Sequence, residues 1–327
     1  MGDILYGLVA VLLGVAGSYL LFWLLNALRN LLPEKIAEKF NVFAFLTPAA
    51  FLLLIVLVYP FVQTINWSFR ANSRFQEWVG FENYVEMLGD ASFYSILLNN
   101  FLWVMFVPAI TVFFGTMVAT LSNNVGPRRE KVFKSLIFMP MSISLIAAST
   151  IWSYMYVYSP PGRPVIGFFN AVAEGAGFES QPWLTISTFH LNSFMLMAVV
   201  VWLQTGYAMV IISAAIKAVP EETLEAARID GANAYQIFMR VILPQVWGTV
   251  MAVFITTLIM VMKIFDVVLA MTGGNFDTKV LAYEWYIQFF EAGKLGNASA
   301  IVMVLTVLIT PLMWLQIRTV RQQEMLR

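Results

Sequence analysis

The residues best suited to a specific interaction lie in one polar segment, 217–245, which is flanked by long apolar stretches. It contains Glu225, the small residues Ala226 and Ala227, and then, after three further residues, Gly231. Small alanines allow close approach to another surface, and a glycine permits a tight turn. With three basic and four acidic residues among 29, the segment is too polar to span a bilayer.

The same segment carries the signals of two short helices. Pro220 suits a first helical turn, and the acidic residues that follow it favour the positive end of the helix dipole. Gly231 interrupts the pattern, Asn233 can cap a second helix, and Pro244 precedes the next apolar stretch. This helix–turn–helix would lie either on the membrane surface or in a groove of a partner protein. Its balanced charge favours the protein groove, because anionic membrane surfaces attract basic segments.

Two charges stand inside another apolar stretch, 246–271. Lys263 and Asp266 are three positions apart, so a helix would place them on one face. Charges inside a membrane span are functional candidates by default. The 16 residues from Trp247 to Lys263 correspond to about 24 Å of helix, which puts the pair near the outer interface. A structural pair that neutralises itself there is the alternative.

The composition excludes several other chemistries. The chain has no cysteine and one histidine, His190, so disulfides, thiolate sites, cysteine nucleophiles and a histidine metal cluster are excluded. The formal net charge is zero, so no basic field indicates binding to nucleic acid. Only 12% of the residues are charged, against about 25% in a soluble domain, and the mean hydropathy is +0.77. Most of the surface must therefore face membrane lipid.

Seven apolar stretches are long enough to cross a membrane, since one helix needs roughly 20 residues. We therefore predict an all-α polytopic membrane protein with about seven transmembrane helices. We expect the first stretch to be retained rather than cleaved, because its start is acidic and no A-x-A site follows it. The stretches are 4–26, 43–66, 93–122, 135–158, 183–216, 246–271 and 295–317.

The distribution of Lys and Arg predicts the orientation of these spans. Four segments on one side hold thirteen of the 19 basic residues, the other side holds five, and Lys263 lies in a span. The richer side should be cytoplasmic, which puts the amino terminus outside and the carboxyl terminus inside. The cytoplasmic segments would be 27–42, 123–134, 217–245 and the tail after 317.

Two longer connections would then be external. Segment 67–92 combines interfacial aromatic residues with acidic residues, which predicts a surface or re-entrant helix over the bundle. Segment 159–182 starts with proline and glycine and is apolar over 165–172, which predicts a turn followed by a short interfacial helix.

The polar segment resembles a known motif, the EAA loop of binding-protein-dependent ABC permeases. That motif has the order E-A-A, three residues, G, nine residues, I, any residue, L-P. Here Val241 stands in place of the isoleucine. The residues that match are Glu225, Ala226, Ala227, Gly231, Leu243 and Pro244.

Flanking segments support the resemblance, which covers 43–318. VGFENYVEMLGD (79–90), TGGNFDT (272–278) and the residues from Gly296 to Ala300 are similar to parts of sugar permeases, although Asn275 replaces a usual proline. Within the sugar permeases, the α-glucoside type is the most similar over 128–144 and 201–232.

The resemblance implies a six-helix type I importer core with one extra amino-terminal helix, in the cytoplasmic membrane of a bacterium. The partners implied are a second permease, two ATPase subunits and an extracytoplasmic solute-binding protein that delivers a sugar or glycoside. ATP and Mg²⁺ would be bound by the ATPases, because this chain has no G-x-x-x-x-G-K-[ST] loop. We therefore expect a transport subunit that is not itself an enzyme and binds no cofactor.

The implied organisation has four parts. Residues 1–42 would form the extra helix and a linker, and 43–92 the first core helix with the external segment. Residues 93–318 would form the permease domain, including the coupling loop 217–245, and 319–327 a cytoplasmic tail.

The resemblance also implies roles in the coupling loop. Glu225 would pair with a basic group of the ATPase, Ala226 and Ala227 would allow close approach, and Gly231 would make the turn. The alternative for Glu225 is a solvated surface charge. The neighbouring loop residues Arg228 and Asp230 would be either solvated or paired within the loop.

By the same resemblance, the substrate path runs beside the spans on either side of that loop. Gln204 and Tyr207 share one face of the first span, where they would bind either a hydroxylated substrate or a neighbouring helix. The second span has a less polar stripe that either lines the path or simply packs. Its residues are Thr257, Met260, Val261 and Ile264.

Two other classes of protein remain as alternatives. A secondary sugar transporter driven by an ion gradient usually shows internal repeats or buried acids, and Asp266, next to Lys263, is the only acid in a predicted span. An intramembrane enzyme would need a nucleophile with a base or a metal cluster, and no such set is apparent in the sequence.

Overall fold

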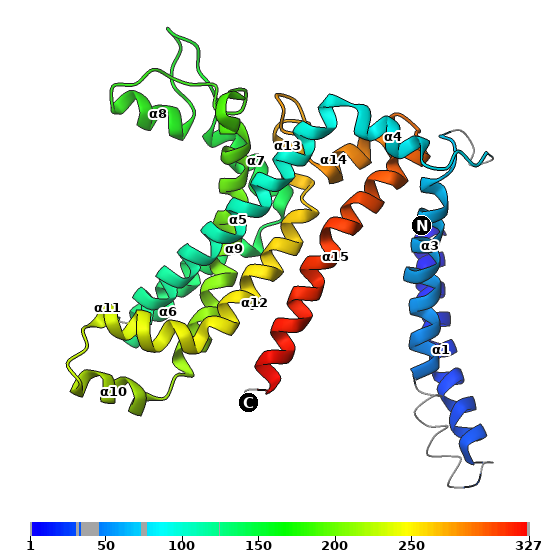
Figure 1. Ribbon diagram of the computed structural model, residues 1–327, viewed down its shortest axis with the longest axis horizontal. Helices are drawn as coiled ribbons and strands as arrows, with labels where there is room; N and C mark the ends of the chain where they lie inside the picture. Colours follow the sequence, from blue (N-terminus) through cyan, green and yellow to red (C-terminus); the bar gives the residue numbers. More distant parts are fainter. Residues whose placement is uncertain (1, 31–32, 34–45, 73–76, 124, 326–327) are drawn as a thin grey trace. The chain divides into compact units, whose positions relative to one another are not determined.

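The computed structural model describes residues 2–30, 33, 46–72, 77–123 and 125–325. These residues are nearly all helical, and the described part contains one isolated β-bridge, between Arg70 and Trp78. The chain divides into two compact units, Met1–Asn66 and Trp67–Arg327 (Figure 1).

The first unit consists of two helical stretches. α1 (Gly2–Asn30) is a helix of 29 residues. The second stretch, Leu46–Ser68, contains a π-helical turn at Leu54–Val58 followed by α3 (Tyr59–Ser68), whose last two residues belong to the second unit. None of its most apolar 18 residues is buried, which suits a helix surrounded by lipid. Most of the predicted cytoplasmic segment 27–42, including the boundary at 42, lies outside the described residues.

The second unit holds twelve α-helices within its described residues. They are α4 (Glu82–Gly89), α5 (Ala91–Asn123), α6 (Pro127–Phe138), α7 (Leu145–Met155), α8 (Phe168–Gly175), α9 (Leu191–Lys217), α10 (Glu221–Ile229), α11 (Ala234–Ile237), α12 (Leu243–Met262), α13 (Asp266–Met271), α14 (Leu281–Tyr286) and α15 (Leu295–Met325). Short 3₁₀ turns occupy Met139–Ser142 and Thr188–His190, and π turns occupy Phe238–Ile242 and Ile287–Glu291.

The centre of this unit is the packing of α5, α9 and α12 against one another, with α15 packed on α12 (Figure 1). A cluster of buried side chains that includes Met209, Ile212 and Val250 joins the three helices. α5 and α9 approach so closely at Gly115 that a methyl group there would lie 2.5 Å from the Cβ atom of Ala208. The apolar composition of these helices therefore serves contact with both protein and lipid.

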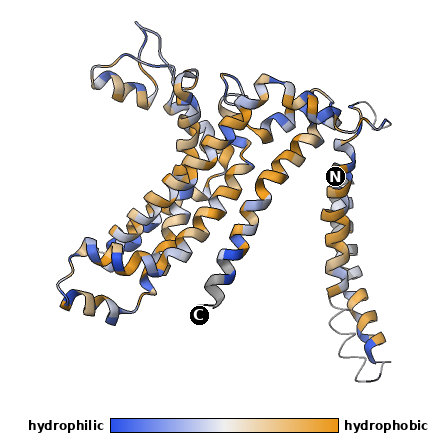
Figure 2. Cartoon of the chain, viewed as in Figure 1, coloured by the Kyte–Doolittle hydropathy of each residue, from blue (hydrophilic) through white to orange (hydrophobic). Residues whose placement is uncertain are grey.

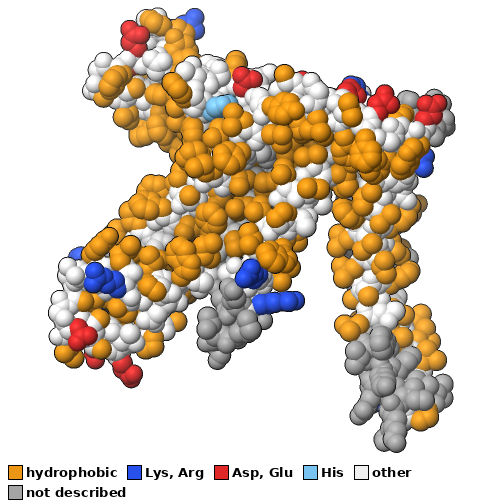
Figure 3. All heavy atoms as spheres, in the orientation of Figure 1, with side chains coloured by type: hydrophobic (Ala, Val, Ile, Leu, Met, Phe, Trp, Pro, Cys, Tyr) orange, Lys and Arg blue, Asp and Glu red, His pale blue; other side chains and the backbone are white. Residues whose placement is uncertain are grey.

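The surface is apolar in the manner of a protein that lies in a membrane. Apolar residues predominate along the long helices (Figure 2). Hydrophobic side chains cover their flanks, while charged side chains gather towards their ends (Figure 3). Five helical stretches in the described residues are long and apolar enough to cross a membrane, or six if one bent pair counts as a span. α1 is not among them, and the count of seven stays a prediction.

One predicted span is not a single helix. Residues 135–158 were expected to cross the membrane directly, but Pro127–Ser142 and Leu145–Met155 are bent by 102°. Pro140 lies in the 3₁₀ turn at the bend, and Ser144 starts α7 as its cap, accepting a hydrogen bond from Ala147 N at 3.3 Å. The uninterrupted hydropathy of this stretch hides the break, because hydropathy measures composition and not backbone conformation.

The predicted span 246–271 also has different ends. The continuous helix starts at Ala234, runs through α11 and the π turn into α12, and ends at Met262. Lys263 follows this end and is exposed, whereas Asp266 begins the separate helix α13. The two residues therefore flank a helix break and do not share a helical face. Both are described, and no salt bridge joins them.

The two short helices predicted in the segments 67–92 and 159–182 are present, and their external location stays a prediction. α4 lies within the segment 67–92, and α8 begins three residues later than the predicted start at 165. In the second unit, α4, α8 and α14 lie at one end, and α10 lies at the other end with the carboxyl end of α15 (Figure 1).

Candidate functional site

The polar segment folds as the predicted helix–turn–helix. Pro220 is the residue before α10 (Glu221–Ile229), and Gly231 follows it with φ of +80°, a conformation that glycine adopts without strain. Asn233 caps α11, accepting a hydrogen bond from Gln236 N at 2.9 Å, while the Gln236 side chain accepts one from Asn233 N at 2.9 Å. The second helix is not separate, since it continues into α12.

α10 presents its side chains to solvent. No residue of this helix is buried: Glu225, Ala226, Arg228 and Asp230, its C-cap, are exposed, and Ala227 is half-buried. The salt bridges among the described residues do not include Glu225. Its carboxylate is therefore available to a group on another molecule.

Two apolar side chains on the same loop were not recognised in the sequence. Ile229 is 86% exposed at the end of α10, and Tyr235 is 71% exposed in α11. Large apolar side chains beside an exposed acid are typical of a surface that a partner covers. Ile229 stands between Arg228 and Asp230, and this apolar residue between two charges was a signal that could have marked it.

The predicted substrate path is partly closed by contacts within the chain. The Gln204 side-chain amide on α9 donates a hydrogen bond to the Met260 sulfur on α12 at 3.1 Å. Thr257 is 2% exposed and donates to Val253 O at 2.9 Å, so its hydroxyl faces its own helix. Tyr207 packs half-buried against the cluster that joins α5, α9 and α12.

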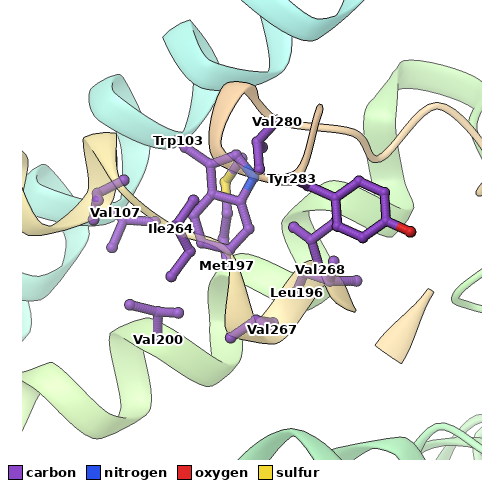
Figure 4. Packing of buried hydrophobic residues seen from close by; sticks show 11 residues of the cluster. Trp103, Val107, Leu196, Met197, Val200, Ile264, Val267, Val268, Val280 and Tyr283 are labelled. Atoms are coloured by element: carbon purple, nitrogen blue, oxygen red, sulfur yellow. The ribbon is translucent and has the colours of Figure 1, made fainter. Parts of the chain in front are cut away.

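The two remaining residues of the predicted stripe lie in a second buried cluster. Val261 and Ile264 belong to the cluster that also holds Trp103 of α5 and Met197 of α9. Figure 4 shows Ile264 between these helices. Val261 and Ile264 are both 3% exposed or less. In this conformation the residues of the stripe, apart from the half-buried Met260, pack in the buried core of the helix bundle.

An apolar groove of about 610 Å³ lies between α5, α6 and α9. Trp202 and Thr205, two residues before and one residue after Gln204, contribute to its wall, together with Phe114 and Leu136. The groove is therefore on a different face of α9 from the bond that Gln204 makes to α12.

A tightly bonded loop at the other end of the unit was not recognised as a site. The loop 272–280 contains four residues with positive φ, namely Gly273, Gly274, Phe276 and Asp277. Asn99 of α5 donates to Asp277 O at 2.5 Å and to Lys279 O at 2.9 Å. Asn192 at the start of α9 donates to Phe276 O at 2.6 Å.

Further contacts fix the same loop. The Asn100 side chain accepts a hydrogen bond from Leu281 N at 2.7 Å, and Tyr283 donates to Gly273 O at 2.7 Å. Burial raises the pKa of Tyr283, which keeps the phenol protonated as a donor. The signal in the sequence was the adjacent amide pair Asn99 and Asn100 inside the apolar stretch 93–122.

Asn275, the residue at which the sequence departs from the sugar-permease motif it resembles, belongs to this loop. Its backbone N–H donates to Thr272 O at 3.1 Å, and its side-chain amide donates to the same oxygen at 2.8 Å. A proline has no N–H to give and no side-chain donor, so it could form neither bond, and the side-chain bond in particular requires the amide of Asn275.

Comparisons with known proteins agree with this architecture. The family model described as "Binding-protein-dependent transport system inner membrane component" matches residues 111–321. The alpha-glucoside transport system permease protein AglF of Rhizobium meliloti is 42% identical over 91% of this chain and 87% of its own length. The osmoprotective compounds uptake permease protein GgtC of Synechocystis is 41% identical over 86% of this chain and 100% of its own length.

Solved structures show the same fold. A chain of a bacterial ABC transporter for the import of the polysaccharide alginate matches 87% of this chain and 98% of its own length, with a TM-score of 0.75 and 18% identity. A chain of the alginate transporter in complex with a periplasmic protein bound to an alginate pentasaccharide matches with a TM-score of 0.72 and 18% identity. This integral membrane chain therefore belongs to the family of binding-protein-dependent transport system inner membrane components.

Proposed function

We propose that this chain is one permease subunit of an ATP-driven importer and forms half of the pathway for a sugar or glycoside, of the α-glucoside type. The observation that carries the proposal is α10, an exposed helix that presents Glu225 and two alanines and ends at the Gly231 turn. Membership of the family and the 42% identity to an alpha-glucoside permease support it.

In this mechanism α10 docks on a cytoplasmic ATPase. Glu225 pairs with a basic group of that subunit, and the small side chains of Ala226 and Ala227 allow the helices to approach closely. Arg228 and Asp230 lie at the rim of the contact, and exposed Ile229 adds apolar area. Two ATPase subunits bind ATP and Mg²⁺, and when they close on each other they displace α10. That displacement opens the substrate path between the two permease subunits to the outer side of the membrane.

The path for the sugar would run beside α9 and α12, next to a second permease subunit. Gln204 and Tyr207 would bind hydroxyl groups, and a sugar that reaches Gln204 would replace its weak bond to the Met260 sulfur. Thr257, Val261 and Ile264 are buried within this chain, so they would act mainly by supporting these two helices. Lys263 and Asp266 would lie at the outer end of the path.

The proposed topology is seven spans in the cytoplasmic membrane of a bacterium, with the amino terminus outside. The extra helix and linker occupy 1–42, the first core helix and external segment 43–92, the permease domain 93–318 and the tail 319–327. The excess of Lys and Arg on one side supports the orientation. Because the chain has no cysteine, single cysteines placed at Ile229 and at Ile166 would report the side by labelling with an impermeant maleimide.

The identity to GgtC favours a second class of substrate, the osmoprotective compounds of that relative's name. A transport experiment distinguishes the two classes. The chain, its second permease, the ATPase and the binding protein are reconstituted in vesicles, and the uptake of an α-linked glucose disaccharide is compared with that of an osmoprotective solute.

We expect uptake of the disaccharide to require ATP and the binding protein and to be independent of ion gradients. If only the osmoprotective solute is taken up, the substrate belongs to the class of osmoprotective compounds and not to the α-glucosides. Uptake driven by an ion gradient without ATP would establish the secondary transporter instead.

A further inference from the structure

Three helix ends meet next to the coupling helix. The Glu130 carboxylate on α6 forms salt bridges with Lys134 of the same helix at 2.5 Å and with Lys217, the last residue of α9, at 2.5 Å. The Lys134 ammonium also donates to Ser213 of α9 and, at 3.3 Å, to Asn123 at the end of α5. We call these five residues the Glu130 network.

The network is well sheltered and well bonded. The side chains of Glu130 and Lys134 are 13% and 20% exposed, whereas that of Lys217 is 53% exposed. An ammonium group has three donors, and the three acceptors that Lys134 finds use all of them. One carboxylate therefore holds two cations together, and without it the two ammonium groups would repel each other across the α6–α9 junction.

A second contact fixes the same two helices further along α9. At Gly206, a methyl group would lie 2.6 Å from Ile137 O and 2.8 Å from the Cα atom of Phe138. The backbones of α6 and α9 are thus in direct contact there. Lys217 is eleven positions after Gly206 in the same helix, about 16 Å along its axis. Held at two points that far apart, the end of α9 cannot pivot against α6.

Only three residues connect this fixed end to the coupling helix. Ala218, Val219 and Pro220 lie between Lys217 and the start of α10 at Glu221. Val219 packs against the buried cluster that joins α5, α9 and α12. A displacement of α10 is therefore applied almost directly to Lys217 and through it to Glu130.

We propose that the Glu130 network is the rigid connection through which a displacement of α10 moves α6 and α9 together. Glu130, Lys134 and Lys217 act as positioning residues for coupling and do not touch substrate. The proposal rests on the coupling role of α10 proposed above. It adds that α6 moves together with α9 when the ATPase displaces α10, a role that the EAA residues alone do not explain.

The test compares four variants of the complete transporter. Glu130→Gln and Lys217→Gln each break the ion pair between α6 and α9, whereas Lys217→Arg preserves it. Lys131→Gln, the loss of an exposed charge on the same helix, is the matched control. Lys217 is half-exposed, so its replacement should not unfold the chain.

Two readouts are taken from each variant. The first is the number of sugar molecules transported per ATP hydrolysed in vesicles. The second is the distance distribution between spin labels on cysteines placed at Val132 and Glu222, two exposed positions on α6 and α10.

We expect Glu130→Gln and Lys217→Gln to broaden the distance distribution and to lower the transport ratio by at least about fivefold, the lower end of typical coupling between sites. Lys217→Arg and Lys131→Gln should retain both wild-type values. A narrow distribution and an unchanged ratio in both glutamine variants would overturn the proposal. If the unaltered complex shows no ATP-driven uptake, the proposed function fails, and the distance distribution alone then supports or overturns the network.

Discussion

The close contact between α6 and α9 leads to a sharp prediction for Gly206→Ala. The added methyl group would lie 2.6 Å from one backbone oxygen of α6 and 2.8 Å from a backbone carbon. Carbon atoms in contact are normally about 3.5–4.0 Å apart, so the two helices must separate by on the order of 1 Å. Neither clashing atom belongs to a flexible side chain that could turn away.

The size of the effect follows from two opposing terms. Alanine favours a helix over glycine by about 1 kcal/mol. Overpacking of a tight contact costs about 1–3 kcal/mol, and the separation also weakens the dispersion contacts on either side. We expect a net loss of about 1–2 kcal/mol, which for a chain of 327 residues corresponds to a fall in melting temperature of roughly 1.5–3 °C.

The measurement is thermal unfolding of the purified chain in detergent, followed by tryptophan fluorescence. Gly89→Ala in α4 is the matched control, because a methyl group at Gly89 would meet no atom within 4 Å. Its melting temperature should equal that of the unaltered chain or rise slightly. Equal melting temperatures for the Gly206 and Gly89 variants would refute the close contact.

Three further predictions concern the outer loop, the coupling turn and the path. Asn99→Ala removes two hydrogen bonds from a buried side chain to the loop 272–280 and should lower the free energy of unfolding by about 2 kcal/mol, as thermal unfolding would show. Gly231→Val forces a branched residue to φ of +80°, a strain of about 1–2 kcal/mol, and should weaken ATPase binding in pull-down; unchanged binding would contradict a role for the turn. Gln204→Leu and Tyr207→Ala should each alter the KM for sugar uptake without changing ATPase binding, and normal uptake in both would leave them as packing residues.

Local chemistry made the coupling loop predictable from the sequence. A glycine at a positive φ and an asparagine in a capping box each act within four residues, so Gly231 and Asn233 could be placed without the fold. Pro220 was expected in the first helical turn and is the N-cap, one residue earlier. The class of protein was equally accessible, because a 12% charged content cannot cover a surface in water.

What the sequence did not reveal depends on distant contacts or on backbone breaks. Asn99 and Asp277 are 178 positions apart, and the sequence around either residue does not predict their hydrogen bond. The bend at Met139–Ser142 and the end of α12 at Met262 both fall inside apolar stretches. The mean hydropathy does not change at either point, so it does not reveal the break in the helix. For the same reason Lys263 and Asp266 looked like neighbours on one helix.

The separation of Gln204 from part of the predicted stripe has a similar cause. Helical spacing placed Met260 and Val261 in one group, but only the bundle decides which side chain faces the neighbouring helix. Met260 accepts the bond from Gln204, whereas Val261 is buried in the cluster around Trp103.

The central claim is that this chain works through an ATPase bound at Glu225. The most direct test is affinity purification of the tagged chain from membranes, with mass spectrometry of its partners and MgATP-driven uptake in vesicles. We expect the unaltered chain to recover a second permease and an ATPase. Glu225→Lys should lose the ATPase and uptake while it remains inserted, and Glu174→Lys, the same charge reversal on exposed α8, should keep both. Full ATPase recovery and normal uptake with Glu225→Lys, or sugar transport by the chain alone without ATP, would contradict the account.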